Sequence, residues 1–179
     1  MRSDAAKGGL LQLWKQYFGP YATIVGLDIR PECRVFEEDG VSIQIEDQSD
    51  ENFLASVLER FGAPKIVIND GSDKMTDISK SFRFLYPRIA SDGTYLVEDL
   101  HTVYWEEYGS GLRKPESFIE VCKGLIDELN AEDSRGSVHE TEFSKNTLSI
   151  HFYDSVVVFE KARYGRKYAP KLEPRETTS

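Results

Sequence analysis

The stretch that decides the fold is residues 65–99, KIVINDGSDKMTDISKSFRFLYPRIASDGTYLVED. Short, mostly apolar runs of strand length stand near its two ends, at 66–68 and 94–97, and acidic residues follow each run within two positions. Between them, apolar residues from 78 to 86 recur at helical spacing. A strand–helix–strand crossover of this length places its two strands side by side and parallel. This segment therefore predicts the centre of a parallel α/β sheet.

The same alternation extends in both directions from this centre. The C-terminal end differs, because two strand-like runs are joined around Asp154 and read as an antiparallel hairpin. The sequence thus predicts a three-layer, Rossmann-like α/β domain with a mostly parallel sheet, helices on both faces and a hairpin at one edge. The expected helices cover 10–18, 53–61 and 118–129, and the expected strands cover 22–27, 41–46, 147–153 and 155–161.

Composition narrows the function classes. The chain has 179 residues, with 22 basic side chains against 31 acidic ones and a net charge of −9, which disfavours nucleic-acid binding. No apolar run approaches the roughly 20 residues of a membrane helix. Two cysteines are too few for a disulfide framework. We expect one cytoplasmic domain over 1–162, able to form a homo-oligomer, and a mobile basic tail over 163–179.

Acidic residues follow strand after strand. Asp28, Asp47 and Asp70 each come just after an apolar run, and Glu98 and Asp99 follow another. The carboxyl ends of parallel strands share one edge, where such sheets bind ligands. A single residue of this kind is more often a solvated loop charge or a helix cap. The repetition at successive strand ends favours a functional edge.

Asp70, Glu98 and Asp99 are the candidates for a metal site. If the two strands before them are neighbours, the three carboxylates converge and repel one another unless a cation neutralises them. An all-oxygen cluster suits Mg²⁺ rather than zinc. Alternatively, one of them points inward and the others cap the following segment. The spacing alone leaves both possibilities open.

Two positions fit a nucleotide. An acidic residue such as Asp28, at the end of an early strand, commonly accepts hydrogen bonds from ribose hydroxyls. Asp47 and Gln48 lie after the next strand and could bond to the amino edge of a base. The chain contains no GxGxxG loop that would support these assignments.

Several stretches together resemble one family. The most specific are Asp-Gln-Ser-Asp at 47–50 and Glu-Asp-Leu-His-Thr at 98–102. The sequence is similar to the S-adenosylmethionine-dependent O-methyltransferases of macrolide tailoring, the mycinamicin and macrocin sugar methyltransferases, and more distantly to cephalosporin hydroxylase-like proteins. The resemblance runs from about residue 8 to residue 161 and is carried by 8–18, 25–29, 47–50, 68–73, 95–102 and 149–155.

The resemblance implies two cofactors, S-adenosylmethionine and Mg²⁺, and methyl transfer to a hydroxyl of a sugar or glycosylated natural product. It implies that Mg²⁺ binds the residues matching Asp70, Glu98 and Asp99. The small-molecule acceptor itself cannot be read from the residues.

The resemblance also implies roles for the other candidates. Asp28, Asp47 and Gln48 match positions that hold the ribose and adenine. Asp73 stands where family members carry the histidine regarded as the general base, so Asp73 is the expected catalytic residue. A carboxylate is a weaker base than histidine, although a metal-bound hydroxyl needs less help.

The sequence departs further from the family's pattern at its N-terminal end than it does at Asp73. The family's first strand and glycine-rich loop should precede Gly8, and only residues 1–7 stand there. That strand is central in the family's sheet, so without it two neighbouring strands keep unpaired backbone or pair directly. We therefore expect this chain by itself to bind S-adenosylmethionine weakly or not at all. The alternative function is a truncated, non-catalytic binding or interaction domain.

Aromatic residues gather in the loop after Glu98 and Asp99. Tyr104, Trp105 and Tyr108 could form a lid over an apolar acceptor, or the loop could pack on its own aromatic rings. The sequence does not favour either arrangement.

Overall fold

The structure is a computed structural model that describes residues 9–72 and 74–163, and the statements below concern these residues. The α/β class is confirmed, and each expected strand and helix is present within a few residues of its predicted bounds. The strands are β1 (Ile24–Asp28), β2 (Val41–Ile45), β3 (Ile66–Asn69), β4 (Thr94–Val97), β5 (Thr147–Tyr153) and β6 (Val156–Lys161). The α-helices are α1 (Gly9–Phe18), α2 (Glu51–Phe61), α3 (Met75–Leu85), α4 (Phe118–Leu129) and α5 (Glu142–Asn146).

The strands form two sheets instead of the single predicted one. β1 and β2 make a parallel pair, and a second sheet has the order β3-β4-β6-β5. In it β3 and β4 are parallel, whereas β6 is antiparallel to both β4 and β5, which confirms the C-terminal hairpin. β1 and β3 do not pair with each other. Of the two outcomes expected without the family's first strand, the structure has the one in which the neighbouring strands stay apart.

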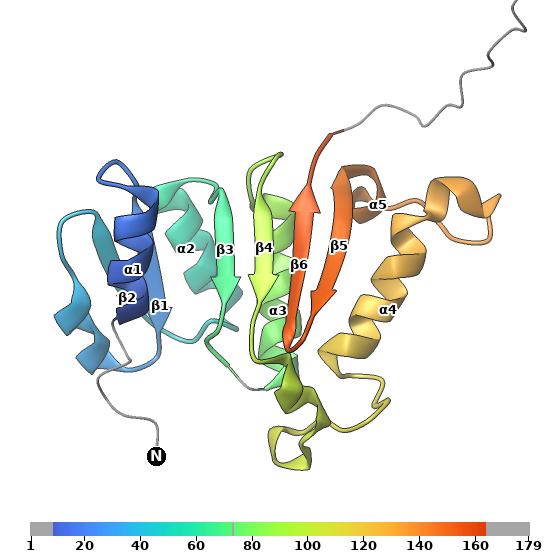
Figure 1. Cartoon of the computed structure of the whole chain (residues 1–179), viewed down its shortest axis with the longest axis horizontal. Helices are drawn as coiled ribbons and strands as arrows, with labels where there is room; N and C mark the ends of the chain where they lie inside the picture. The colour runs from blue at the N-terminus through green and yellow to red at the C-terminus, as the bar shows by residue number, and fades with distance from the viewer. Residues whose placement is uncertain (1–8, 73, 164–179) are drawn as a thin grey trace, which may run out of the picture.

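Helices lie on both sides of the strands. Figure 1 shows α1 in front of the β1–β2 pair and α2 and α3 behind the strands, so the three layers are present. Over the four-stranded sheet, the described helices lie on the rear face. No described helix is both long enough and apolar enough to cross a membrane.

The main core lies between the four-stranded sheet and the helices behind it. Phe82 of α3 is at its centre, with ring centroids 5.2 Å from Tyr95, 5.4 Å from Phe118 and 4.6 Å from Phe159. All four side chains are almost completely buried. Cys122 of α4 is also fully buried here.

A second, smaller core belongs to the β1–β2 pair. Its buried members are Cys33, Val41 and Ile43, and Leu11 of α1 packs against them. A Cβ atom on Gly26 would lie 2.8 Å from the Ile43 Cδ1 atom and 3.6 Å from Leu11. The absence of a side chain at this position makes room for the Ile43 side chain of the neighbouring strand β2.

Local signals explain where the helices begin and end. The Asp50 carboxylate accepts hydrogen bonds from the N–H groups of Asn52 and Phe53, which caps α2, and Gly62 ends it in the left-handed region at φ 83°. The short helix α5 was not predicted. Thr141 begins it with a reciprocal capping box.

Candidate metal and cofactor site

The predicted acidic edge exists. Asp28 is the last residue of β1, Asp70 follows β3, and Glu98 follows β4. The arrowheads of β1, β3 and β4 point to the same end of the molecule in Figure 1, and β2, which precedes Asp47, is parallel to β1. The prediction that Asp28 and Asp70 share one end of the strands is therefore confirmed.

The register of β3 and β4 places Asp70 beside Glu98. Asn69 pairs with Val97, and the Glu98 N–H donates to the Asn69 carbonyl over 3.0 Å. The next residue along each strand is one of the two acids. Asp70 and Glu98 therefore directly follow the paired ends of two hydrogen-bonded strands.

The charges of the three acids interact. Burial raises the pKa of Glu98 above its usual value, and the negative charges of Asp70 and then Asp99 raise it further. Within residues 9–72 and 74–163, no group of three His, Cys, Asp or Glu side chains is already arranged as a ligand set for a metal. The acids gather at one place, and Mg²⁺ binding by them remains a prediction.

The backbone of Asp99 turns sharply away from β4. Asp99 has φ 53°, in the left-handed region, and its carbonyl accepts hydrogen bonds from the Thr102 N–H over 3.1 Å and the Thr102 Oγ1 over 2.9 Å. Both bonds hold the turn in which the chain leaves β4 after Asp99. His101 Nδ1 lies 3.8 Å from an Asp99 carboxylate oxygen, which is longer than a hydrogen bond.

The aromatic loop packs on itself. The Trp105 ring stacks on Tyr108 with centroids 5.8 Å apart and meets His101 edge-on at 5.1 Å. These contacts correspond to the second of the two arrangements considered for this loop. The side chains of Tyr104 and Trp105 remain about half exposed beside the acids.

Asp28 has a partner that the sequence analysis missed. The Arg30 guanidinium donates to both carboxylate oxygens, over 2.9 Å from Nε and 2.7 Å from Nη2, and the Arg30 N–H adds a bond of 2.9 Å. This ion pair lowers the pKa of Asp28 to about 2. A carboxylate followed two residues later by arginine was the available signal. The orientation of Asp28 is therefore fixed before any ligand arrives.

The Asp28→Asn variant is expected to lose about 2 kcal/mol of folding free energy at pH 7, because one pKa unit corresponds to about 1.4 kcal/mol. The folded-state pKa lies below the unfolded value of 3.8, so this stabilisation is complete above about pH 4 and is lost as pH falls towards 2. Urea unfolding at pH 7 and pH 2.5 measures it. Equal pH dependence in wild type and variant would contradict the assignment.

Asp47 and Gln48 are tied to neighbouring backbone and side chains. The Asp47 carboxylate accepts the Ser49 N–H over 2.7 Å, a bond that lowers the pKa of Asp47. Gln48 reaches across to β3, where its Nε2 donates to the Asn69 Oδ1 over 3.3 Å. A Cβ atom on Gly71 would overlap the Gln48 side-chain oxygen, so a larger residue at position 71 would displace the Gln48 side chain.

Asn69, which was not among the candidate residues, joins these residues to the core. Its Nδ2 donates to Ser81 Oγ over 3.0 Å and to the Tyr95 hydroxyl over 3.1 Å, and all three residues are buried. Burial raises the pKa of Tyr95 to about 12, so its hydroxyl stays neutral. An amide suits this position because it can donate twice and accept from Gln48.

Asp73, the expected catalytic base, lies outside the described residues. The residues on either side of Asp73 take part in local hydrogen bonds. Ser72 Oγ donates to the Asp77 carboxylate over 3.0 Å and accepts the Lys74 N–H over 3.1 Å. The predicted tail at 164–179 also lies outside the described residues.

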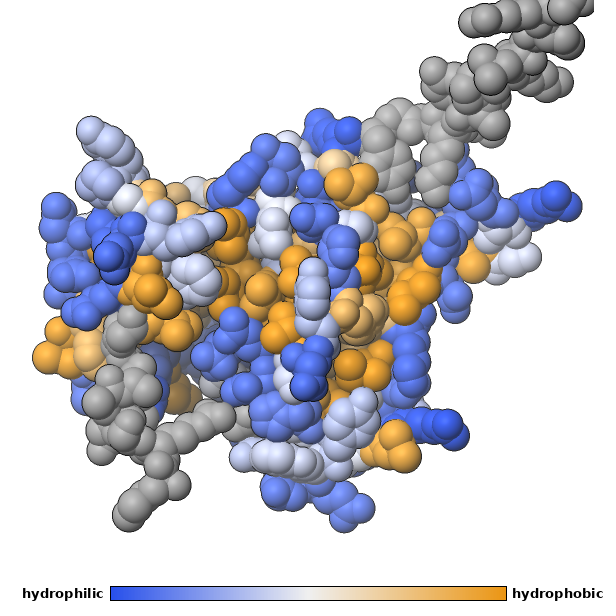
Figure 2. All heavy atoms as spheres, viewed as in Figure 1, coloured by the Kyte–Doolittle hydropathy of each residue, from blue (hydrophilic) through white to orange (hydrophobic). Residues whose placement is uncertain are grey.

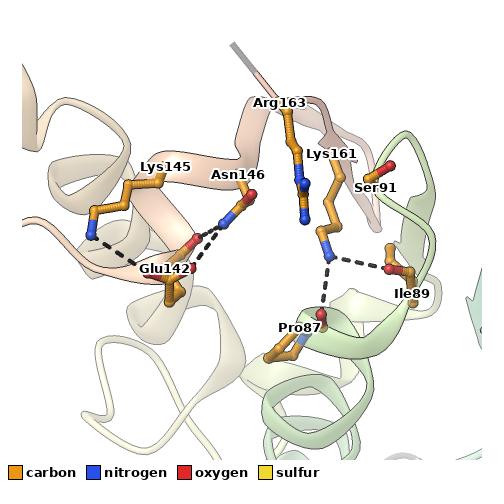
Figure 3. A pocket seen from close by; sticks show the side chains of 8 residues that line it. All are labelled: Pro87, Ile89, Ser91, Glu142, Lys145, Asn146, Lys161 and Arg163. Carbon is orange, nitrogen blue, oxygen red and sulfur yellow. Dashed lines mark hydrogen bonds and ion pairs between the residues drawn. The ribbon is translucent and has the colours of Figure 1, made fainter. Parts of the chain in front are cut away.

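A separate cavity opens at the other end of the four-stranded sheet, where Lys145, Lys161 and Arg163 line it (Figure 3). The Lys161 ammonium donates to the carbonyls of Tyr86, Pro87 and Ile89 over 3.1–3.3 Å. These bonds provide partners for backbone carbonyls that lie just after the C-terminal end of α3. The cavity contains none of the candidate site residues, and Lys161 has a structural role there.

Comparison with known proteins finds no matching family model, but it does find similar proteins. The chain is 32% identical over 177 residues to the mycinamicin VI 2''-O-methyltransferase of Micromonospora griseorubida. It is 33% identical over 174 residues to an 8-demethyl-8-(2-methoxy-alpha-L-rhamnosyl)-tetracenomycin-C 3'-O-methyltransferase of Streptomyces olivaceus. These matches cover 96% and 94% of this chain but only 44% of either relative.

A solved structure has the same fold. The MycE methyltransferase of mycinamycin biosynthesis, in complex with Mg, SAH and mycinamycin VI, superposes with a TM-score of 0.82 at 30% identity. The match covers 95% of this chain and 44% of that chain. The resemblance to sugar O-methyltransferases read from the sequence is confirmed. The chain spans less than half the length of the proteins that it matches.

Proposed function

We propose that this chain carries the metal and nucleotide half of an S-adenosylmethionine-dependent O-methyltransferase that acts on a sugar hydroxyl of a glycosylated natural product. The observation that carries the proposal is the register of β3 and β4, which sets Asp70 beside Glu98 with Asp99 close enough to affect its charge. The similar enzymes support it, since their names describe O-methylation of glycosylated compounds and the solved one holds Mg and SAH.

The three acids fit Mg²⁺ by their chemistry. Carboxylate oxygens are the ligands that this cation prefers. Burial and then the negative charges of Asp70 and Asp99 raise the pKa of Glu98, and a divalent cation bound there would stabilise its charged form. When bound there, Mg²⁺ supplies Lewis-acid chemistry that lowers the pKa of an acceptor hydroxyl. The exposed Asp70 and half-buried Asp99 leave this position open to an acceptor from solvent.

The nucleotide would lie along the β1–β2 end of the same edge. The Asp28 Oδ1 atom accepts two hydrogen bonds from Arg30 and the Oδ2 atom accepts one, so Oδ2 retains acceptor capacity for a ribose hydroxyl. Asp47 and Gln48 would meet the adenine. We keep Asp73, three residues after Asp70 in the sequence, as the proposed base.

The further features of the proposal concern the whole protein. We propose a cytoplasmic enzyme with one domain over 1–162 and a small hydroxylated acceptor as its substrate. Association into a homo-oligomer is supported by apolar side chains on the outer face of α1, where Leu13 and Tyr17 are 54% and 75% exposed.

The test is methyl transfer from labelled S-adenosylmethionine to mycinamycin VI, with and without Mg²⁺, using millimolar cofactor to offset weak binding. We expect label in the acceptor only when Mg²⁺ is present, and roughly a 100-fold lower rate for Asp70→Asn, because one metal ligand is lost. Asp92→Asn is the control, since Asp92 pairs with Lys65 at the opposite end of the strands. A chain that neither binds Mg²⁺ nor transfers the methyl group would instead be a non-catalytic interaction domain.

A further inference from the structure

The cavity at the end of the four-stranded sheet away from the acidic edge has more positive than negative side chains in its wall. Its volume is about 450 Å³, and it opens between α5, the end of β6 and the segment that joins α3 to β4 (Figure 3). Among the described residues that line it, Lys145, Lys161 and Arg163 are basic and Glu142 is acidic. Because the whole chain has a net charge of −9, the charge at this cavity is opposite in sign to that of the molecule.

Lys161 supplies positive charge to this cavity, although its own donors are already used. Its ammonium donates hydrogen bonds to three backbone carbonyls, and an ammonium has three N–H groups. Burial lowers the pKa of Lys161, and the positive charge of Arg163 lowers it further. The two cations therefore repel each other, and an anion bound beside them would stabilise both charged forms.

The Glu142 carboxylate is held by residues of its own helix. The Lys145 ammonium lies 3.5 Å from its Oε1 atom, and the Asn146 Nδ2 atom donates to its Oε2 atom over 3.2 Å. In the part of the chain that the structure describes, no ion pair joins Glu142 to Lys161 or to Arg163. Glu142 and Lys145 therefore balance each other, and the positive charges of Lys161 and Arg163 are left over at the cavity.

Arg163 has donors that can reach a ligand. Its side chain is exposed, and Figure 3 shows it directed from the end of β6 into the cavity. Among the described residues, its guanidinium has no hydrogen-bond or ion-pair partner. A guanidinium presents its N–H groups as a planar fork that bonds two oxygens of one phosphate or carboxylate group at once. Arg163 is therefore the residue that would contact an anion directly.

The size and the apolar part of the wall favour a small organic anion over a bare ion. A volume of about 450 Å³ lies within the range of small-molecule pockets. Pro87 and Ile89 give the wall an apolar part. Figure 2 shows hydrophobic residues next to hydrophilic ones at the surface around the end of β6. An occupant with an anionic group at one end and carbon atoms at the other would use both kinds of wall.

We propose that this cavity binds a small phosphate monoester, whose phosphate group is hydrogen-bonded by Arg163 and stabilised by the positive charge of Lys161. Phosphate fits better than carboxylate, because a monoester carries close to two negative charges above pH 7 and two positive charges are left over in the wall. The site lies at the opposite end of the strands from the acidic edge. The inference does not depend on the proposed methyl transfer.

The test is an NMR titration of the full 179-residue chain at pH 7.5 and constant ionic strength with three anions: glycerol 3-phosphate, inorganic phosphate and acetate. We expect glycerol 3-phosphate to shift the amide signals of Ile89 and Asn146 saturably, with a Kd on the order of 1 mM. Acetate should bind at least about tenfold more weakly, because it carries one charge. Inorganic phosphate should also bind more weakly than the ester, since it has no carbon atoms to contact the apolar wall. The pKa of Lys161, followed by its side-chain carbon signals, should rise when the ester is bound.

Two variants of one residue separate the guanidinium fork from charge alone. Arg163→Gln should weaken glycerol 3-phosphate binding at least about tenfold, and Arg163→Lys should restore only part of the affinity, because an ammonium keeps the charge and loses the fork. The side chain is exposed, so both variants should unfold at the wild-type temperature. Arg34→Gln is the matched control, since Arg34 is an exposed arginine between β1 and β2, and its affinity should not change.

Four results would overturn the proposal. The first is that glycerol 3-phosphate causes no saturable shift at the cavity. The second is that acetate or inorganic phosphate binds as tightly as the ester, which would leave screening or a free ion as the explanation. The third is equal affinity in Arg163→Gln and wild type. The fourth is that the same signals shift with protein concentration in the absence of added anion, which would make a second copy of the chain the occupant.

Discussion

Glu98→Gln is expected to weaken Mg²⁺ binding on the order of 100-fold, about 2.7 kcal/mol, because it removes one of the three charged ligands. The same change should raise the stability of the metal-free protein at neutral pH. The folded-state pKa of Glu98 lies above its unfolded value, so the folded chain loses stability as pH rises through that range. A neutral amide avoids this cost. Calorimetric Mg²⁺ titration and thermal unfolding measure the two effects.

Glu59→Gln is the matched control, since Glu59 is an exposed residue of α2 away from the acidic edge. It should leave both the Mg²⁺ affinity and the unfolding midpoint unchanged. If Glu98→Gln binds Mg²⁺ as tightly as wild type does, Glu98 is not a ligand. If Glu98→Gln also fails to stabilise the metal-free protein, then burial and the charges of Asp70 and Asp99 do not raise the pKa of Glu98 in the folded chain.

Phe82→Ala should destabilise the fold by about 3–5 kcal/mol, since it removes a buried aromatic ring at the centre of the main core and leaves a cavity. Phe82 contacts rings from β4, α4 and β6, so the loss affects the layer on which Glu98 stands. Chemical denaturation measures the change in unfolding free energy.

Phe84→Ala on the same helix is the comparison for Phe82→Ala. Phe84 is only partly buried, and the Arg88 guanidinium lies 4.1 Å from its ring centroid. Its removal should cost about 1 kcal/mol, the value of a partly exposed ring and a cation–π contact. Equal costs at the two positions would mean that the ring cluster around Phe82 is not the centre of the fold.

The order of the elements could be predicted because each depends on local pattern. The helix that begins after Asp50 and ends at Gly62 has both a capping side chain and a terminal glycine, and β4 occupies the four residues predicted for it. The hairpin around Asp154 follows from two short apolar runs with almost nothing between them. The helix α5 was missed, because its five residues have no periodic apolar pattern.

The contacts of the site could be predicted only in part. Strand ends put Asp70 and Glu98 on one edge, and this follows from the alternation of the elements alone. Two contacts could not be predicted: the ion pair of Arg30 with Asp28, and the hydrogen bond from Gln48 to Asn69, 21 residues away in the sequence. Both depend on side-chain directions, which a sequence pattern does not determine. The division into two sheets depends on pairing between distant strands, which local patterns leave undetermined.

The two halves of the candidate site rest on cores of very different size. Among the described residues, the carboxylates after β3 and β4 stand on a cluster of fifteen buried side chains, whereas Asp28 and Asp47 stand on the β1–β2 pair, whose cluster has three. Regions with few buried contacts open first under denaturing stress. We therefore expect the β1–β2 unit to open before the main core, so that local unfolding there would disrupt the nucleotide end while the acidic cluster keeps its native shape.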